Sequence, residues 1–424
     1  MTKRTVLKPT GLPAAAEQTY GVRYGNWVFV SAIMATDFRS GLVPQVRGNP
    51  AIPLAGEEVT IRETKYIYQT IQTVLAAAGT DIQNGVRIDQ YPVSRSAVDP
   101  YHVARKNILK PPRPASTSVD ILGLLSPEAT IQVETIAIVP APGFQKEGIN
   151  TDKIPQPLAG YSPAVRAGDF VFLAGQVPTD WKSGIAPEAR VDPNFWEGSR
   201  IERETRYILK NMALTLEAAG SSMPNVVKAG VYLTDIDDLP RFDRVWREAF
   251  PDAPPARTVF PIRSLGVTES CVEINFVAVT DDGKTKKEII STKSARSPIF
   301  HESQAVRAGE FLFLSGLMAA DENGLIDAAR INPGYPYDRN TAASQMDDIM
   351  AQAQAICRAA GTDIGRALRV LNVHTTLNEY YAAKEVRRRC FPDGEPATAT
   401  ILVAAPLQIP GCSILTDLWV AMEP

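Results

Sequence analysis

Two charged residues stand within otherwise apolar stretches of the sequence. Arg257 lies in the segment PPARTVF and Glu273 in the segment CVEINFVAV. A guanidinium is always charged and offers a planar fork of donors, so Arg257 suits the binding of a carboxylate. The alternative for Arg257 is a surface ion pair, which contributes little to stability. Glu273 either faces solvent or lies in a cleft, on the same face of its strand as Cys271 and Asn275. We expect the cleft.

The other reactive side chains are few and scattered. Cys271 is a candidate nucleophile because it is close to Glu273, although a lone cysteine on a strand is usually a small core residue. The run His301-Glu302-Ser303 holds the residue types of a catalytic triad, but three adjacent side chains cannot face one another. The three histidines show no metal-ligand spacing, so we expect no metal site.

The composition indicates a soluble globular protein of several domains. Its 424 residues are enough for two or three domains. The formal net charge of −3 gives no reason to expect binding to nucleic acid or to an anionic membrane. The four cysteines form no CxxC pair, which is typical of a reducing compartment, and no apolar run suits a signal peptide or a membrane span. We therefore expect a cytoplasmic protein.

The sequence repeats itself at regular intervals, each about a third of the chain. The tripeptide AAG occurs at 77–79, 218–220 and 359–361, so its three glycines are equally spaced. A second landmark, a glycine followed by an apolar and aromatic stretch, returns in the same order as YGNWVFVSA, AGDFVFLAG and AGEFLFLSG. Two independent landmarks with nearly the same period indicate three tandem copies of one unit.

Each copy has the pattern of a small α+β unit. In the second copy the expected elements are, in order, a strand at 170–173, a helix that ends at Gly220, a strand at 226–234, a helix at 239–250 and a strand at 272–279. Two helices can cover only one face of a sheet, so the other face must be buried elsewhere. We expect the three sheets to pack on one another around a central pseudo-threefold axis.

Two polar segments indicate the joints between the copies. The segments 141–160 and 281–297 are rich in proline, glycine or lysine, and we interpret them as linkers. The domains expected from this are unit one at 1–140, unit two at 158–281 and unit three at 298–424.

The order of elements and motifs resembles the RidA (YjgF) family of reactive-intermediate deaminases. Unit two is the most similar: AGYSPAVRAGDFVFLAGQVP resembles the family's GPYS…G…SGQIP segment, PPARTVF its PARS/T motif and CVEINFVAV its IEIEAIAV strand. Members of this family are usually homotrimers of one chorismate-mutase-like domain, with a ligand cleft between each pair of subunits. The resemblance therefore implies an intramolecular pseudo-trimer of three RidA-type units.

The resemblance also assigns roles to residues of unit two. Arg257 of the PARS/T motif would hold a substrate carboxylate, and Glu273 would orient or deprotonate a water. Tyr161 matches the family's cleft tyrosine, and Gly175 matches the glycine whose N–H approaches the ligand. The remaining residues expected at the substrate are Asp243, which stands where the family has asparagine, Thr258 and Cys271.

Units one and three depart from this pattern. Ser116 and Thr398 replace the arginine, and Gln132 and Thr416 replace the glutamate. The cleft tyrosine is replaced by Gln18 in unit one and by Glu302 in unit three. We therefore expect degenerate sites in these two units and a single active cleft built around unit two.

The expected function is hydrolytic deamination of a carboxylate-bearing imine or enamine, without a cofactor. Two alternatives stay open: a non-catalytic protein that binds small carboxylates, and an amidohydrolase that opens a cyclic or aromatic amide. Ring-opening amidohydrolases of three-repeat architecture use Ser–Lys pairs, and no such repeated pair is visible in this sequence.

The expected partners are a small-molecule substrate, with no nucleic acid and no membrane. Substrate specificity would come from loops such as 180–198, where Trp181, Phe195 and Trp196 suit a larger or aromatic substrate. Because three units in one chain can bury one another's sheets, we expect a monomer or a dimer of pseudo-trimers.

Overall fold

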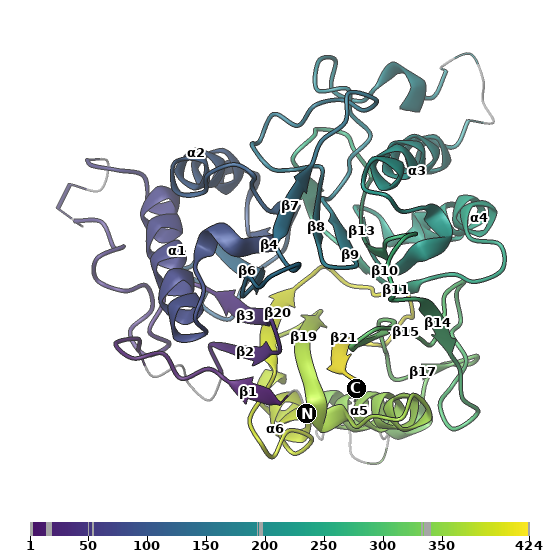
Figure 1. Cartoon of the computed structure of the whole chain (residues 1–424). Coiled ribbons are helices and arrows are strands. Elements are labelled where there is room, and N and C mark those ends of the chain that lie inside the picture. Colours follow the sequence, from purple (N-terminus) through teal and green to yellow (C-terminus); the bar gives the residue numbers. More distant parts are fainter. Residues whose placement is uncertain are drawn as a thin grey trace.

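Three α+β units lie around one centre. The computed structural model describes residues 3–13, 19–49, 51–52, 55–192, 194, 198–331, 334 and 341–422. Three sheets of six or seven strands surround a common axis, and the long helices lie at the periphery (Figure 1). The predicted α+β fold, in which three tandem units form an intramolecular pseudo-trimer, is confirmed.

Unit one shows the plan that the other two repeat. Its elements are β1 (Arg4–Val6), β2 (Gly21–Tyr24), β3 (Trp27–Ile33), α1 (Val59–Ala77), β4 (Gly85–Pro92), α2 (Val98–Ile108), β5 (Ala115–Asp120) and β6 (Ile131–Ile138). The strand order is β1-β2-β3-β6-β4-β5, in which β4 and β5 run parallel and the other neighbours antiparallel. The connection between the parallel strands β4 and β5 is helix α2, as a crossover requires.

Units two and three have the same plan. In unit two the elements are β7 (Lys146–Ile149), β8 (Ala164–Ala167), β9 (Phe170–Leu173), α3 (Arg200–Ala218), β10 (Val226–Leu233), α4 (Leu239–Ala249), β11 (Ala256–Pro261), β12 (Ser264–Leu265) and β13 (Val272–Val279). In unit three they are β14 (Lys287–Ile290), β15 (Ala305–Ala308), β16 (Phe311–Leu314), the hairpin β17 (Ala320–Asp321) and β18 (Gly324–Leu325), α5 (Thr341–Ala359), β19 (Ala367–His374), α6 (Tyr380–Arg388), β20 (Ala397–Leu402) and β21 (Ile414–Ala421). The short strand β12 leaves its own unit and pairs with β5 of unit one.

The two segments expected to be linkers each contain a strand. β7 pairs antiparallel with β8, and β14 pairs antiparallel with β15, so both segments belong to the sheets that follow them. These strands are only four residues long, with the sequences KEGI and KEII, and they lie at sheet edges. Charged residues are common on edge strands because they discourage pairing with other chains, and they also make such strands look like linkers. We propose that units two and three begin at β7 and β14.

The repeated glycine ends the first long helix of each unit. Gly79, Gly220 and Gly361 have φ angles of +81°, +71° and +80°. Glycine adopts this left-handed region without steric cost, which is why it commonly terminates helices. The chain then turns back to form the next long strand of the sheet, which is β4, β10 or β19.

Aromatic side chains from all three units meet at the axis. Trp27, Phe170 and Phe311 occupy equivalent positions in the three units, and their ring centroids lie 5.2–5.7 Å apart in each pair. They are 1–2% exposed and belong to one cluster with residues of all three sheets. Each sheet therefore buries its inner face against the other two, which is the packing predicted from the helix count.

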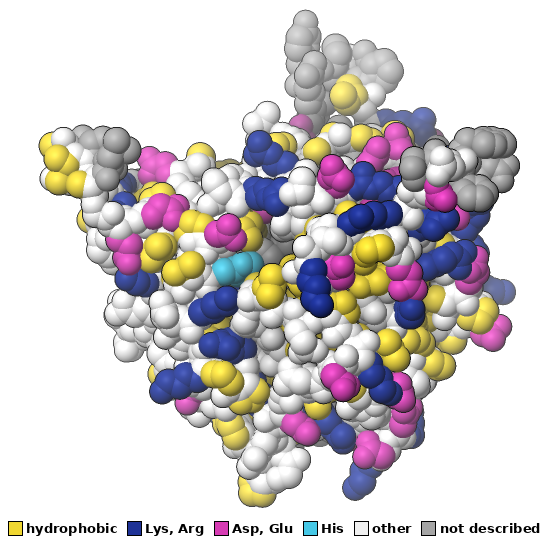
Figure 2. Space-filling view, turned by 90° about the horizontal axis from the view of Figure 1, so that it is seen from above, with side chains coloured by type: hydrophobic (Ala, Val, Ile, Leu, Met, Phe, Trp, Pro, Cys, Tyr) yellow, Lys and Arg dark blue, Asp and Glu magenta, His cyan; other side chains and the backbone are white. Residues whose placement is uncertain are grey.

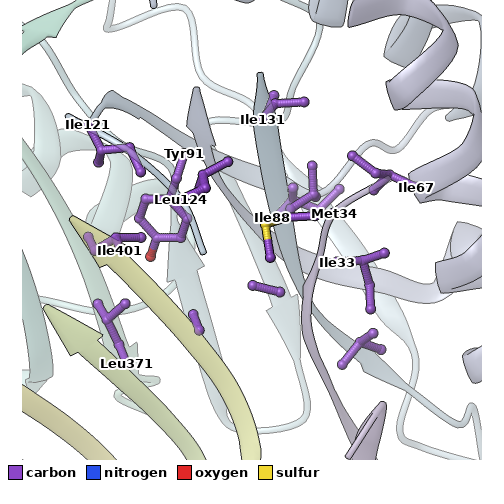
Figure 3. Packing of buried hydrophobic residues seen from close by; sticks show 14 of the residues in the cluster. Ile33, Met34, Ile67, Ile88, Tyr91, Ile121, Leu124, Ile131, Leu371 and Ile401 are labelled. Atoms are coloured by element: carbon purple, nitrogen blue, oxygen red, sulfur yellow. The ribbon is translucent and has the colours of Figure 1, made fainter. Parts of the chain in front are cut away.

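The outer face of each sheet packs under its helices. In unit one Ile33, Met34 and Ile88 lie beneath Ile67 of α1 (Figure 3). The same apolar cluster continues across the unit boundary, where Tyr91 of unit one lies near residues of unit three (Figure 3). The units therefore share apolar core as well as sheet contacts.

Buried charges lie beside the aromatic cluster. Arg87, Lys228 and Arg369 occupy equivalent positions on β4, β10 and β19 and are 4–6% exposed. Their ion-pair partners include Asp89, 2.9 Å from Arg87, and Asp417, 3.1 Å from Lys228. Arg369 pairs with three acidic residues, Asp89, Glu134 and Asp417. A buried charge that lost its partner would be destabilising, so these pairs constrain how the three sheets meet.

The surface carries both signs of charge. On the face shown in Figure 2, lysine and arginine side chains alternate with aspartate and glutamate, with apolar side chains between them. No helix in the described part of the chain is both long and apolar enough to cross a membrane.

Candidate active site between units one and two

Large cavities lie at two of the three unit boundaries. The cleft between units one and two holds a cavity of about 420 Å³, and the cleft between units three and one a cavity of about 460 Å³. Near the boundary of units two and three, Glu302 lines a cavity of only about 50 Å³. We name these the one–two, three–one and two–three clefts.

The one–two cleft is lined on one side by residues of unit two and on the other by residues of helix α2 and strand β5 of unit one. Unit two contributes the expected site residues Glu273, Tyr161 and Gly175, together with Trp181. Unit one contributes Ser116 and residues of α2. The cavity is lined further by Val98, Asp99, His102, Val103, Lys106, Ser118, Leu158, Ala159, Val177, Gly266 and Val267. Three residues expected in one site therefore do share a cavity.

Glu273 is a buried carboxyl group at the wall of this cavity. Burial raises its pKa to about 8, against the smaller opposing effect of a hydrogen bond from the Ser118 N–H. Gly175 lies against it so closely that a Cβ atom on Gly175 would fall 1.8 Å from Glu273 Oε1. Only glycine leaves room for this carboxyl group. Burial of this kind disfavours the charged form and produces an acid that keeps its proton near neutral pH.

Two further titratable side chains line the cavity without carrying charge. Burial, and then the nearby Glu273, raise the pKa of Tyr161 well above its usual value of 10. Burial, with Arg105 and Lys106 nearby, lowers the pKa of His102 to about 3, so its imidazole is neutral in the physiological range. The cavity therefore presents a protonated carboxyl, a phenol and a neutral imidazole to a bound molecule.

The floor of the cavity is a buried hydrogen-bond network of unit one. Ser116 Oγ accepts from Arg105 Nη1 at 2.7 Å and from Gln90 Nε2 at 2.8 Å. Arg105 also donates from Nη2 to the carbonyl oxygen of Ala159 at 2.7 Å, which joins the two units. Gln90 Oε1 accepts from the Tyr101 hydroxyl at 2.7 Å, which fixes the orientation of the amide.

Arg257 lies in a different cleft from Glu273. Strand β10 separates their two strands in the sheet, and Arg257 faces unit three. Its Nη1 donates to Asp243 Oδ1 at 2.8 Å and its Nε to Glu302 Oε2 at 3.0 Å, while the side chain is fully buried. The prediction of one site that contains both Arg257 and Glu273 is therefore wrong. Each cleft lies between two units, and its arginine position belongs to one unit while its glutamate position belongs to the next. Arg257 and Glu273 are close together in the sequence of unit two, but they therefore lie in two different clefts.

The two–three cleft has lost its acid. Strand pairing places Leu415, not Thr416, at the position of Glu273, because Leu415 pairs with Val373 as Glu273 pairs with Tyr232. Leu415 also lies against Gly316 as Glu273 lies against Gly175. Arg257 is thus held by two carboxylates in a cleft that has no equivalent of the Glu273 carboxyl.

The three–one cleft has lost it as well. Gln132 stands at the acid position, and its Nε2 donates to the Thr400 carbonyl oxygen at 3.1 Å. The residues that line the cavity there include the aromatic side chains Phe38, Tyr380 and Tyr381. Among the described residues, the glutamate, the tyrosine and the glycine occur together only in the one–two cleft. Gln18, expected in place of the tyrosine here, lies outside the described residues.

Each cleft nevertheless keeps one buried guanidinium. Where the strand arginine is lost, in units one and three, an arginine appears on the second helix: Arg105 and Arg387. In unit two the same helix position holds Trp246, whose ring centroid lies 5.1 Å from the Arg257 guanidinium carbon. The three helix positions, 105, 246 and 387, are separated by the same interval as the AAG glycines. An alignment of the three repeats therefore shows that an arginine stands on the helix where the strand arginine is absent, and this was missed in the sequence.

The remaining expected residues lie away from the one–two cavity. The Thr258 hydroxyl donates to Asp417 and accepts from Lys228, so it belongs to the axial charges. The Cys271 thiol contacts Glu204 of α3 at 3.0 Å within the helix-side core, because Cys271 precedes β13 and does not follow its alternation. The Gly175 N–H donates to the Ser116 carbonyl oxygen at 3.0 Å and is not free for a ligand. Phe195 and Trp196 lie outside the described residues.

Comparison with known proteins agrees with this architecture. A family model described as Endoribonuclease L-PSP matches residues 151–280. A RutC family protein of Pyrococcus horikoshii is 37% identical over 133 residues, which are 31% of this chain and 97% of that protein. Reactive Intermediate Deaminase A of Arabidopsis thaliana, a chloroplast protein, is 31% identical over 140 residues, which are 33% of this chain and 69% of that protein.

Solved structures give similar matches. A putative endoribonuclease of Thermotoga maritima is 32% identical and covers 32% of this chain and 98% of its own, with a TM-score of 0.28. The curated relatives are matched over more than two thirds of their length, and each covers about one unit of this chain. The chain therefore belongs to the RidA family, with three units of the family joined in one polypeptide.

Proposed function

We propose that the one–two cleft hydrolyses a carboxylate-bearing imine or enamine to a keto acid and ammonia. The observation that carries this proposal is the Glu273 carboxyl, buried at a cavity of about 420 Å³ with its pKa raised to about 8. A catalytic acid or base works best when its pKa is near the working pH. The relative named Reactive Intermediate Deaminase A supports the same class of reaction.

The chemistry needs one group that first gives and then takes a proton. At neutral pH Glu273 is mostly protonated, so it can donate its proton to the imine nitrogen and make the carbon more electrophilic. The carboxylate that results accepts a proton from the water that attacks this carbon. The carbinolamine then loses ammonia, and the sum is one imine and one water converted to one carbonyl compound and one ammonia.

An imine suits this site better than an amide. Attack on an amide places a negative charge on the carbonyl oxygen, and hydrolases stabilise this charge with free N–H donors. The Gly175 N–H at this position is already bonded to the Ser116 carbonyl oxygen. A protonated imine needs no such donor, because attack of water neutralises its charge.

A non-catalytic binding protein is the second candidate. It is favoured by the buried Arg105 guanidinium beside the one–two cleft, whose hydrogen-bond partners among the described residues are all neutral. In this alternative the one–two cleft binds a carboxylate without turnover, and Glu273 serves as one more hydrogen-bonding group.

Ammonia release distinguishes the two candidates. Imines are generated in the assay from amino acids by an amino acid oxidase, and ammonia release is measured above the spontaneous rate. We expect wild-type protein to accelerate release and Glu273→Gln to abolish this acceleration. The matched control is Gln132→Leu, which copies into unit one the leucine found at the same position of unit three, and it should retain the wild-type rate. Ligand-induced thermal stabilisation without ammonia release would support the binding protein.

A further inference from the structure

We infer that the Ser116 hydroxyl, backed by the Arg105 guanidinium, binds the substrate's carboxylate in the one–two cleft, and that this substrate carries a large apolar or aromatic side chain. The inference rests on the proposed function for the class of reaction, but it concerns binding and can be tested without turnover. It assigns a role to Ser116, which stands where the sequence motif has an arginine and which the sequence pattern marks as part of a degenerate site.

The direction of the Ser116 proton follows from its hydrogen bonds. A serine hydroxyl has one hydrogen to donate and two lone pairs that accept. Arg105 Nη1, at 2.7 Å, and Gln90 Nε2, at 2.8 Å, are both donors, so they occupy both lone pairs. The Gln90 amide cannot be reversed, because its Oε1 accepts from Arg105 Nη1 at 3.2 Å and from Tyr101. The Ser116 proton is therefore left for another acceptor, and the residue lines the cavity.

The charge behind Ser116 is positive and unneutralised. In the described part of the chain, the hydrogen-bond partners of Arg105 are Gln90, Ser116 and Ala159, all of them neutral. Arg105 is 1% exposed as a residue, so the field of its guanidinium is weakly screened by water. A hydroxyl that accepts from a cation is polarised and becomes a stronger donor. The floor of the cavity therefore favours an anion that accepts the Ser116 proton.

The other two guanidinium groups lack this property. Arg257 is held by Asp243 and Glu302, and Arg387 Nη2 lies 3.3 Å from Glu395 Oε2. Both charges are thus neutralised inside the protein. Of these three guanidinium groups, that of Arg105 is the one with no carboxylate beside it among the described residues. Arg105 also lies next to the cleft that contains the Glu273 carboxyl.

The charged side chains of the cavity itself do not oppose an anion. Asp99 is exposed at the rim, and Lys106 is positive, with its Nζ donating to the Leu158 carbonyl oxygen at 2.9 Å. Glu273 is mostly protonated at neutral pH, as its raised pKa requires.

The rest of the cavity indicates the size and polarity of the substrate. Its volume of about 420 Å³ would hold about 14 water-sized groups at ~30 Å³ each. Beyond Ser116 and Glu273 the wall is largely apolar and includes Val98, Val103, Leu158, Val177, Trp181 and Val267. Trp181 is presented from a turn in which it has φ of +59°, an unusual conformation for a bulky residue and one more often kept at ligand sites. A two-carbon or three-carbon substrate would leave most of this surface unfilled.

The test uses indole-3-acetate, which carries a carboxylate on an aromatic ring system, with its neutral amide and with acetate as comparison probes. Binding to the full chain is measured by calorimetry. We expect indole-3-acetate to bind at least tenfold more tightly than either comparison probe. Ser116→Ala should weaken its binding at least tenfold, whereas Ser116→Thr, which keeps the hydroxyl, should stay within a few-fold of wild type. The matched control is Thr398→Ala, at the equivalent position of unit three, which should leave the affinity unchanged. Thermal unfolding of each variant verifies that it is folded.

The outcomes separate this inference from the proposed function. If Ser116→Ala binds indole-3-acetate as wild type does while Glu273→Gln loses ammonia release, the inference is wrong and the function stands. If Ser116→Ala loses binding but no variant or substrate gives ammonia release, the function is wrong and the inference stands. Equal affinity for acetate and indole-3-acetate would overturn the assigned substrate class.

Discussion

Replacing Glu273 by glutamine should make the protein more resistant to unfolding at alkaline pH. The substitution keeps the shape of the side chain and an oxygen that can accept from Ser118, but it removes the titration. In the folded protein the pKa of Glu273 is raised from its usual 4.5 to about 8, because the carboxylate would be buried at the cavity wall. Between these two values the unfolded chain has lost the proton and the folded chain has kept it.

The sign and size of the effect follow from this difference. Because the folded state binds more protons over this range, the free energy of unfolding of the wild type falls as pH rises from about 4.5 to about 8. A difference of about 3.5 pH units corresponds to about 5 kcal/mol at full extent, at ~1.4 kcal/mol per unit. Between pH 5 and pH 9 most of this change is included, about 4 kcal/mol. Glutamine is neutral at every pH, so the free energy of unfolding of Glu273→Gln does not fall for this reason.

Urea unfolding of both proteins at pH 5, 7 and 9 measures the effect. All other titrating groups are common to the two proteins, so the difference between their free energies of unfolding isolates Glu273. We expect this difference to move in favour of Glu273→Gln by about 4 kcal/mol between pH 5 and pH 9. Glu217→Gln, at an exposed glutamate, is the control and should show no such trend. A pH-independent difference would refute a buried, protonated Glu273 and with it the assigned acid.

Other perturbations test the remaining parts of the structure. The kcat/KM of ammonia release should fall as pH rises through about 8, since the protonated form of Glu273 is the one required. A kcat/KM that rises through about pH 8 would show instead that the reaction begins with the Glu273 carboxylate acting as a base. Arg257→Met should lower the stability by about 3–5 kcal/mol, because it leaves two buried carboxylates without their partner, yet the folded variant should keep its KM for the imine; a large rise in KM would return this arginine to the active site. Gly175→Ala should abolish turnover by displacing the Glu273 carboxyl, whereas Gly316→Ala, where the added Cβ would lie 3.2 Å from a leucine methyl group, should leave turnover intact. Light scattering should give the mass of one or two chains, and a mass of three chains would contradict a pseudo-trimer that closes on itself.

The repeat made most of the fold predictable from the sequence. The equal spacing of its landmarks aligned three copies, and the helix and strand boundaries expected for unit two agree with α3, α4, β10 and β13 to within two residues at the ends that were predicted. The edge strands β7 and β14 were missed because four residues with two adjacent charges carry little strand signal. Their pairing is decided by the neighbouring strand and not by their own sequence.

The site was only partly predictable, for a geometric reason. Glu273, Tyr161 and Gly175 lie in one unit and meet in one cavity, so a pattern within that unit was enough to group them. Arg257 belongs to the same motif set, but its strand faces the next cleft. In a trimer of identical chains every cleft contains the same residues, so it does not matter which of the two adjacent clefts a given residue of one chain faces. In a chain of three unequal units this determines which residues lie together in one site.

Joining the three units changes what a single mutation does. In a trimer of identical chains one codon change enters three clefts at once, and its cost in free energy is incurred three times. Here a substitution at position 116 enters the one–two cleft only, and the Arg105 charge that lies behind it is separate from Arg257 in the two–three cleft. Each cleft of the single chain can therefore be changed without changing the other two.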